Sequence, residues 1–165
     1  MSKPITDERA ERFRQVIAKR QTDLTVVLEN VNDPHNIGAV LRSCDAVGIS
    51  EIYVIYSEVN SDVFSHYIGT NSASGSKKWV KAHFFRDLDE CFSVIRSKYD
   101  KVYGTLLSDE SISLYDLDLC GAVALVFGNE QKGISDRAKK HLDGNFIIPQ
   151  HGMVQSLNIS VACAV

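Results

Sequence analysis

The sequence has few cysteines and no apolar run of the length that a membrane span needs. Its four cysteines are scattered, without a C-x-x-C pair, so we expect small buried apolar residues rather than a disulfide framework or a zinc site. The five histidines also lack metal-ligand spacing, which predicts a protein without a bound metal. The charged N-terminus lacks the apolar core of a signal peptide, so we expect a cytoplasmic protein.

Three motifs of common α/β enzymes are missing as well. The sequence contains no G-x-G-x-x-G dinucleotide fingerprint, no G-x-S-x-G nucleophile turn and no G-x-x-x-x-G-K-[ST] phosphate loop. These absences disfavour a dinucleotide-dependent enzyme, a hydrolase of the common α/β type and a nucleotide triphosphatase.

The pattern of apolar residues predicts a single domain of the α/β class. A chain of 165 residues with 44% hydrophobic and 24% charged residues can bury a sizeable core. Strand-like and helix-like segments alternate, which indicates a mostly parallel sheet with helices on both faces. We expect six strands, at 24–28, 52–55, 79–83, 102–106, 123–127 and 146–148. We expect helices at 6–19, 37–47, 88–98, 135–141 and from 156 onward, and a long polar loop over 57–78.

Positive charge is concentrated at the N-terminus, although the whole chain has a formal net charge of −3. Residues 1–20 carry a local excess of three positive charges, and a basic arm of this kind can bind phosphates. The candidate phosphate-binding residues are Arg9, Arg12, Lys19 and Arg20. A solvated helix face is the alternative interpretation of the same residues.

Three polar loops each follow an expected strand and precede an expected helix. The first bends at Pro34 and brings Asn36 and Arg42 into a helix that starts with small residues. The second contains Gly128, Glu130 and Gly133, and the third runs from Pro149 through Ser156 and Asn158 to Ser160. Each loop also has a simpler interpretation. Arg42 could be an ordinary surface arginine, the second loop a bare turn, and the polar residues of the third loop plain helix caps. Because ligands bind beyond the carboxyl ends of parallel strands, we expect the three loops to converge on one sheet edge.

These loops, in this order, resemble the three signature motifs of the SpoU (TrmH-like) branch of the SPOUT RNA methyltransferases. The matching positions are Asn32, Asn36, Gly38 and Arg42, then Phe127, Gly128, Glu130 and Gly133, then Pro149, Gly152, Val154, Ser156, Leu157, Asn158 and Ser160. The segments 20–26, 34–36, 45–48 and 152–158 are similar to the subgroup that methylates the ribose of guanosine-18 in tRNA.

The resemblance implies transfer of a methyl group from S-adenosylmethionine to a ribose 2′-hydroxyl of tRNA. It implies that Arg42 acts at the 2′-oxygen, that Asn36 and Glu130 orient Arg42 and the ribose, and that Ser156 and Asn158 hold the substrate edge. The role proposed for this arginine in the family is that of a general base, but an arginine does not readily give up its proton, so we favour positioning and stabilisation of the developing alkoxide. Backbone groups would hold the cofactor, at Thr105, Leu106, Gly128, Ile148, Pro149, Met153 and Leu157.

The resemblance also implies an architecture that the residues alone could not predict. The family fold is a six-stranded α/β sheet with a C-terminal trefoil knot, and its members are homodimers with the active site at the interface. We therefore expect a knotted methyltransferase domain over 21–165, with its C-terminal helix cut short, behind a basic RNA-contacting helix over 1–20. Gln150 and His151 depart from the pattern, because apolar residues are expected there, and we expect them to alter the pocket rim.

Two other functions within the same class remain open. The chain could be a catalytically idle RNA-binding relative, although Asn36, Arg42, Glu130 and Asn158 are all present. It could also methylate ribosomal RNA or another tRNA position, although such relatives commonly carry a separate RNA-binding domain in front.

Overall fold

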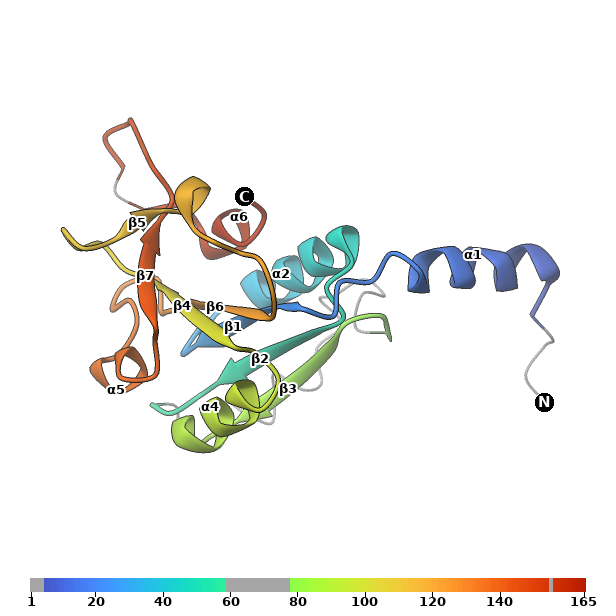
Figure 1. The fold of residues 1–165 in the computed structure, drawn as a ribbon, viewed down its shortest axis with the longest axis horizontal. Coiled ribbons are helices and arrows are strands. Elements are labelled where there is room, and N and C mark those ends of the chain that lie inside the picture. Colours follow the sequence, from blue (N-terminus) through green and yellow to red (C-terminus); the bar gives the residue numbers. More distant parts are fainter. Residues whose placement is uncertain (1–4, 59–77, 155) are drawn as a thin grey trace.

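A computed structural model describes residues 5–58, 78–154 and 156–165, and its centre is a seven-stranded sheet (Figure 1). All pairings between its strands are parallel. The strands lie in the order β3 (Lys81–Phe85), β2 (Glu51–Ile55), β1 (Leu24–Glu29), β6 (Val123–Phe127), β4 (Lys101–Thr105), β7 (Gly144–Ile147) and β5 (Ile112–Ser113). The predicted α/β class is confirmed. The predicted number of six strands is wrong, because the edge strand β5 has only two residues and therefore no recognisable periodicity.

Helices cover both faces of the sheet and create two apolar cores. On one face, α2 (Pro34–Val47) and the short α6 (Ile159–Ala162) pack against each other and against β1 and β2. On the other face lie α4 (Leu88–Arg96) and the short α5 (Asp136–Lys139) (Figure 1). Neighbouring residues of β1 serve opposite cores, Val26 and Leu28 one and Val27 the other, as the two-residue period of a strand requires.

Capping residues fix the ends of the central helices. The carboxylate of Asp33 accepts a hydrogen bond from the backbone N–H of His35 at 2.8 Å, and Pro34 occupies the first helical position. Helix α2 therefore starts three residues before the predicted residue 37, because proline is well suited to a helix start. It ends at Gly48, whose φ of 89° is the left-handed conformation that glycine adopts easily. Asp87 caps α4, which begins at the predicted residue 88.

The N-terminal helix α1 (Asp7–Ile17) buries none of its residues and stands away from the sheet (Figure 1). Thr6 caps it, as predicted. Its apolar stripe does not join either core: Ile17 is exposed, and Phe13 packs on Trp79, with 5.2 Å between the ring centroids. Trp79 lies in the turn before β3, so the third strand begins two residues later than predicted.

The remaining differences are local. Helix α5 is shorter than the predicted 135–141, and a 3-10 helix, η3 (Leu114–Asp116), follows β5.

Cys44 and Cys91 are buried, which raises the pKa of each thiol to about 12, but Cys120 is exposed, so the prediction of burial was wrong for that residue. The loop predicted over 57–78 lies almost wholly outside the described residues. Within the described ranges, no helix is long and apolar enough to span a membrane.

Candidate active site

The candidate site lies at the carboxyl ends of four adjacent strands, β1, β6, β4 and β7. Because all four run in the same direction, the segments that follow them emerge at one edge of the sheet. The three predicted loops follow β1, β6 and β7, and the segment beginning at Leu106 follows β4. The sheet therefore brings together loops that are up to 120 residues apart in the sequence, as the strand pattern predicted.

Hydrogen bonds between side chains join the three loops to one another. Asn36, in the first turn of α2, donates from Nδ2 to Oε1 of Glu130 at 2.8 Å. Asn158, at the start of α6, donates from Nδ2 to Oδ1 of Asn36 at 3.1 Å. These two bonds link residues separated by 94 and 122 positions, one from each motif. We refer to Asn158, Asn36 and Glu130 as the polar triad.

The contacts at both ends of the polar triad determine which side chain donates and which accepts in each hydrogen bond. Oδ1 of Asn158 caps α6 by accepting from the N–H of Ser160 at 2.9 Å and from its hydroxyl at 2.6 Å. The amide nitrogen of Asn158 must therefore face Asn36, whose own amide nitrogen then faces Glu130. At the far end, the carboxylate of Glu130 can only accept when it is ionised. Each side chain thus has one orientation that satisfies its neighbours.

The second loop is closed by its own backbone. Asn129 and Gly133 exchange two hydrogen bonds, at 3.0 and 2.8 Å, and Oδ1 of Asn129 accepts from the N–H groups of Gln131 and Lys132. A Cβ atom on Gly128 would collide with the backbone of Gly133, so only glycine allows the loop to fold back this closely. This closed loop presents Glu130 to Asn36.

Two residues that the sequence analysis missed hold this loop on the sheet. Glu29, at the end of β1, is 1% exposed, and its carboxylate accepts hydrogen bonds from the N–H of Ser135 at 2.9 Å and from its hydroxyl at 2.5 Å. Asn30, with a φ of 53°, accepts at its carbonyl from Nδ2 of Asn129 at 2.8 Å. A polar pair directly after an apolar strand was the available signal, since buried polar groups need partners.

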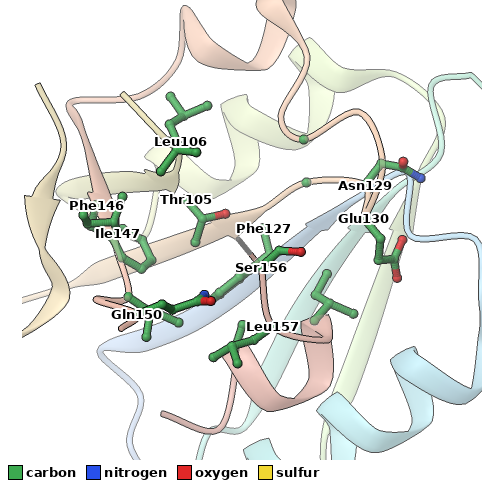
Figure 2. A pocket seen from close by; sticks show the side chains of 16 residues that line it. Thr105, Leu106, Phe127, Asn129, Glu130, Phe146, Ile147, Gln150, Ser156 and Leu157 are labelled. Carbon is green, nitrogen blue, oxygen red and sulfur yellow. The ribbon is translucent and has the colours of Figure 1, made fainter. Parts of the chain in front are cut away.

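A cavity of about 230 Å³ lies beside the polar triad, between the ends of β4, β6 and β7 (Figure 2). Its lining is largely apolar and comes from the loops after these strands and from α6. Five of the seven predicted cofactor residues line it, namely Thr105, Leu106, Gly128, Ile148 and Leu157. Pro149 and Met153 do not line it, and Met153 is 99% exposed. Ser156 and Glu130, two of the predicted catalytic residues, are also part of the wall.

A second hollow, of about 440 Å³, opens on the other side of Glu130. Its lining is entirely polar or charged, with Asn30, Asn32, Asp33, Asn36, Glu58, Asn129, Glu130, Gln131 and Lys132. Asn129 and Glu130 line both spaces, so the end of the polar triad separates an apolar cavity from a polar hollow.

Arg42 is not joined to the polar triad. It is exposed on α2, and within the described part of the chain its guanidinium makes no hydrogen bond or ion pair. The predicted basic residues fall into two groups. Arg9, Arg12 and Lys19 are exposed, whereas Arg20 donates to Asp45 at 3.1 Å and to the carbonyl of Ile49 at 2.9 Å. With 12% of its side chain exposed, Arg20 ties the start of the sheet to α2 and offers little surface to a phosphate.

A family model for the SpoU rRNA Methylase family matches residues 23–165, which include all three loops, the cavity and the polar triad. The chain belongs to the SpoU rRNA Methylase family. Membership agrees with a site built from three loops at the carboxyl edge of a parallel sheet, and the matched residues include every strand from β1 to β7 as well as α6.

Individual SpoU family members are similar over most of this chain. The tRNA (guanosine(18)-2′-O)-methyltransferase of Thermus thermophilus is 41% identical over 160 residues, which cover 97% of this chain and 80% of that protein. The crystal structure of the A. aeolicus TrmH/SpoU tRNA modifying enzyme superposes with a TM-score of 0.79 at 33% identity, over 96% of this chain and 78% of that one. An AdoMet-bound rRNA methyltransferase from Sinorhizobium meliloti has a TM-score of 0.74 at 25% identity, over 88% of this chain and 54% of that one.

Proposed function

We propose that this protein transfers a methyl group from S-adenosylmethionine to the ribose 2′-oxygen of guanosine-18 in tRNA. The observation that carries the proposal is the position of the polar triad between the apolar cavity and the polar hollow. The two spaces suit the two substrates, because the largely apolar wall can pack against the flat base of the donor and the polar hollow can accept a hydroxylated ribose. The similarity to guanosine-18 methyltransferases supports the choice of nucleotide.

The cavity fits the cofactor that the family implies. Its wall offers aliphatic and aromatic surface from Leu106, Phe146 and Ile148 together with the exposed backbone of Gly128. Such a combination suits a nucleoside that is bound by packing and by main-chain groups. S-adenosylmethionine supplies an electrophilic methyl group when it is bound there, and the apolar wall excludes water from it.

In this proposal the polar triad positions the acceptor. Glu130 and Asn36 border the hollow where the ribose enters, and their mutual hydrogen bond limits the orientations that either side chain can present to a hydroxyl group. Methyl transfer forms a bond to the 2′-oxygen in line with the bond that breaks, so fixed positioning lowers the barrier substantially. The proton leaves the 2′-hydroxyl for an RNA phosphate or water, because an arginine does not readily accept it.

We place Arg42 in a partner subunit's site. Its guanidinium is free of partners in the described part of its own chain and can stabilise a developing alkoxide by charge. Arg42 lies on α2, which packs against α6. Exposed valines in and just after these two helices, Val47, Val161 and Val165, are suited to burial between two copies. A homodimer with the site at its interface would bring Arg42 of one subunit to the polar triad of the other. The C-terminal trefoil knot of the family belongs to the same proposal.

We assign tRNA contact to α1, which projects its basic residues away from the sheet (Figure 1). Arg9 and Arg12 are exposed on this helix, and Lys19 is exposed just after it. Within the described part of the chain none of the three has an ion pair, so they can bind phosphates without breaking one. Arg20 is the weakest of the four candidates, since Asp45 already occupies its guanidinium.

Methyl transfer from labelled S-adenosylmethionine to unmodified tRNA, followed by mapping of 2′-O-methylated nucleotides, tests the proposal. The expected result is one methylated ribose, at guanosine-18 of the D-loop. A tRNA transcript with 2′-deoxyguanosine at that position is the matched control, because it lacks only the acceptor oxygen. Methylation at another ribose would refute the choice of nucleotide. Failure to methylate either tRNA or ribosomal RNA would refute the proposal that this protein is an RNA methyltransferase.

A further inference from the structure

One polar side chain in the apolar cavity has no partner among the residues that the structure describes. Gln150 follows β7 and lines the cavity, and its Oε1 is buried without a hydrogen-bond donor from those residues. The next residue, His151, is exposed and is not part of the cavity wall.

A buried acceptor without a donor is unfavourable, and most such groups in folded proteins are satisfied. A ligand that brings an N–H group to this wall of the cavity would satisfy it. We propose that Gln150 recognises the adenine base of the methyl donor, with Oε1 accepting a hydrogen bond from the 6-amino group. The inference depends on the proposed use of S-adenosylmethionine.

The position of Gln150 favours adenine over the rest of the donor. Figure 2 shows Gln150 on the side of Phe146 and Ile147, across the cavity from Asn129 and Glu130. The transferred methyl group must lie near Glu130, where the polar hollow begins, so the opposite wall is left for the base. Aromatic and aliphatic side chains there suit the faces of a purine.

The chemistry of the carboxamide also matches this base. A glutamine presents an acceptor oxygen and a donor N–H₂ side by side, and adenine presents a donor amino group beside an acceptor ring nitrogen. An apolar residue at this position would pack against the base but could not distinguish it from a purine without the amino group. Gln150 therefore adds selectivity for the 6-amino group to a pocket otherwise formed by packing.

Calorimetric titration with S-adenosylhomocysteine, and with its analogue that carries hydrogen in place of the 6-amino group, tests the inference. For the wild type and for His151→Ala, the matched control, we expect the adenine ligand to bind about fivefold more tightly. Gln150→Leu should bind the two ligands within about twofold of each other, because it cannot accept a hydrogen bond. Gln150→Glu keeps an acceptor oxygen and should keep the preference.

The same titrations separate the possible failures. A Gln150→Leu variant that retains the wild-type preference would overturn the role of Gln150 while leaving the cofactor in place. The same holds for a wild-type protein that binds both ligands equally. A wild-type protein that binds neither ligand would overturn the proposed cofactor and this inference together. Thermal unfolding of each variant shows whether it is folded. If Gln150→Leu is not folded, the ligand preference of Gln150→Glu provides the test instead.

Discussion

At the scale of single residues, the site depends on side chains whose donors and acceptors alternate in one direction. Asn36 is the central member, since it accepts from Asn158 and donates to Glu130. A carboxamide is required there because it carries one donor and one acceptor group on the same planar unit. Neither a carboxylate nor an aliphatic side chain of similar size can do both.

Asn36→Asp is therefore expected to lower turnover by about 100-fold or more, by replacing the donor that faces Glu130 with a second carboxylate oxygen. The apolar cavity is unchanged, so the affinity for S-adenosylhomocysteine should stay close to that of the wild type. Single-turnover methyl transfer and calorimetry measure the two quantities. Asn145→Asp is the matched control, because within the described residues the side chain of Asn145 bonds only to Ser108, at 3.4 Å, outside both spaces. Normal turnover of Asn36→Asp would refute the role of the polar triad.

A second polar cluster lies at the opposite edge of the sheet and concerns stability. The carboxylate of Glu51 accepts hydrogen bonds from Lys98 at 2.7 Å, from His83 at 2.9 Å and from the hydroxyl of Tyr53 at 2.9 Å. Burial pushes the pKa of Glu51 upward, but these three hydrogen bonds outweigh it and lower the pKa to about 2. A carboxyl group with a lowered folded-state pKa stabilises the fold above its ordinary pKa, and that contribution disappears as the pH falls toward the folded value.

We expect the wild type to be more stable than Glu51→Gln at neutral pH, with a gap that shrinks between pH 4.5 and about 2. Urea unfolding at a series of pH values measures the gap directly. Glu110→Gln, an exposed carboxylate outside this cluster, serves as the control and should show no such trend. If the gap between wild type and Glu51→Gln did not change with pH, the proposed ionisation of this cluster would be incorrect.

At the scale of elements, the loop after β6 is held at both ends by hydrogen bonds. Its backbone closes on itself between Asn129 and Gly133, and Glu29 holds its far end through Ser135. Because the loop is attached to β1 and β6 in this way, the two strands determine where Glu130 lies. Loops fixed in this way keep a binding site in shape before the ligand arrives, which lowers the cost of binding.

Gly128→Ala should destabilise the fold by about 1–3 kcal/mol, because the added Cβ meets the backbone of Gly133 and Ile134 and the loop must open. The same opening displaces the cavity wall, so we also expect weaker binding of S-adenosylhomocysteine. Gly152→Ala is the matched control in the third loop, since a Cβ there meets no atom of the described residues within 4 Å. Chemical unfolding and calorimetry check both variants. Equal behaviour of the two would contradict the close approach seen at Gly128.

The sequence predicted those elements that are determined by local chemistry. Asp87 before α4 and Gly48 after α2 are capping signals that act within one turn of the helix, and the predicted helices at 88–98 and 37–47 do begin and end beside them. Helix α2 started earlier than expected because Pro34 is part of the helix rather than of a turn before it. Strand β5 was missed because two residues in contact with β7 have no pattern of their own.

The site was predictable in its location but not in its connections. Parallel strands bring their carboxyl ends together, so the convergence of the loops follows from the order of strands and helices. The hydrogen bond from Asn36 to Glu130 and the contact of Glu29 with Ser135 depend on how distant segments are packed. No local signal in the sequence reports such pairs. The resemblance to a known family supplied the roles of the loops.

At the scale of the whole molecule, the central question is whether one chain is sufficient for catalysis. The polar triad and the cavity lie within one chain, whereas Arg42 is exposed and without a partner in the described part of it. If Arg42 acts on the site of a partner subunit, each site in a dimer combines residues of both copies. A mixed dimer can then contain one intact site even when each subunit carries a mutation.

We expect Arg42→Ala and Asn36→Asp proteins to be inactive alone and to regain about a quarter of wild-type activity after mixing and subunit exchange. In a mixed dimer, one site receives both mutations and the other receives neither. Methyl transfer to tRNA measures the recovery, and mixtures of each variant with itself are the controls. Absence of recovery, with subunit exchange verified, would assign Arg42 to the site of its own chain.

The most direct test of the whole account is the position of S-adenosylhomocysteine in a crystal structure of its complex with this protein. The account predicts the ligand in the cavity between Leu106, Gly128 and Leu157, with its sulfur facing the junction at Glu130 and Asn36. A ligand bound elsewhere, or one in this cavity with its sulfur turned away from Glu130, would contradict the claim that these three loops form one methyl-transfer site.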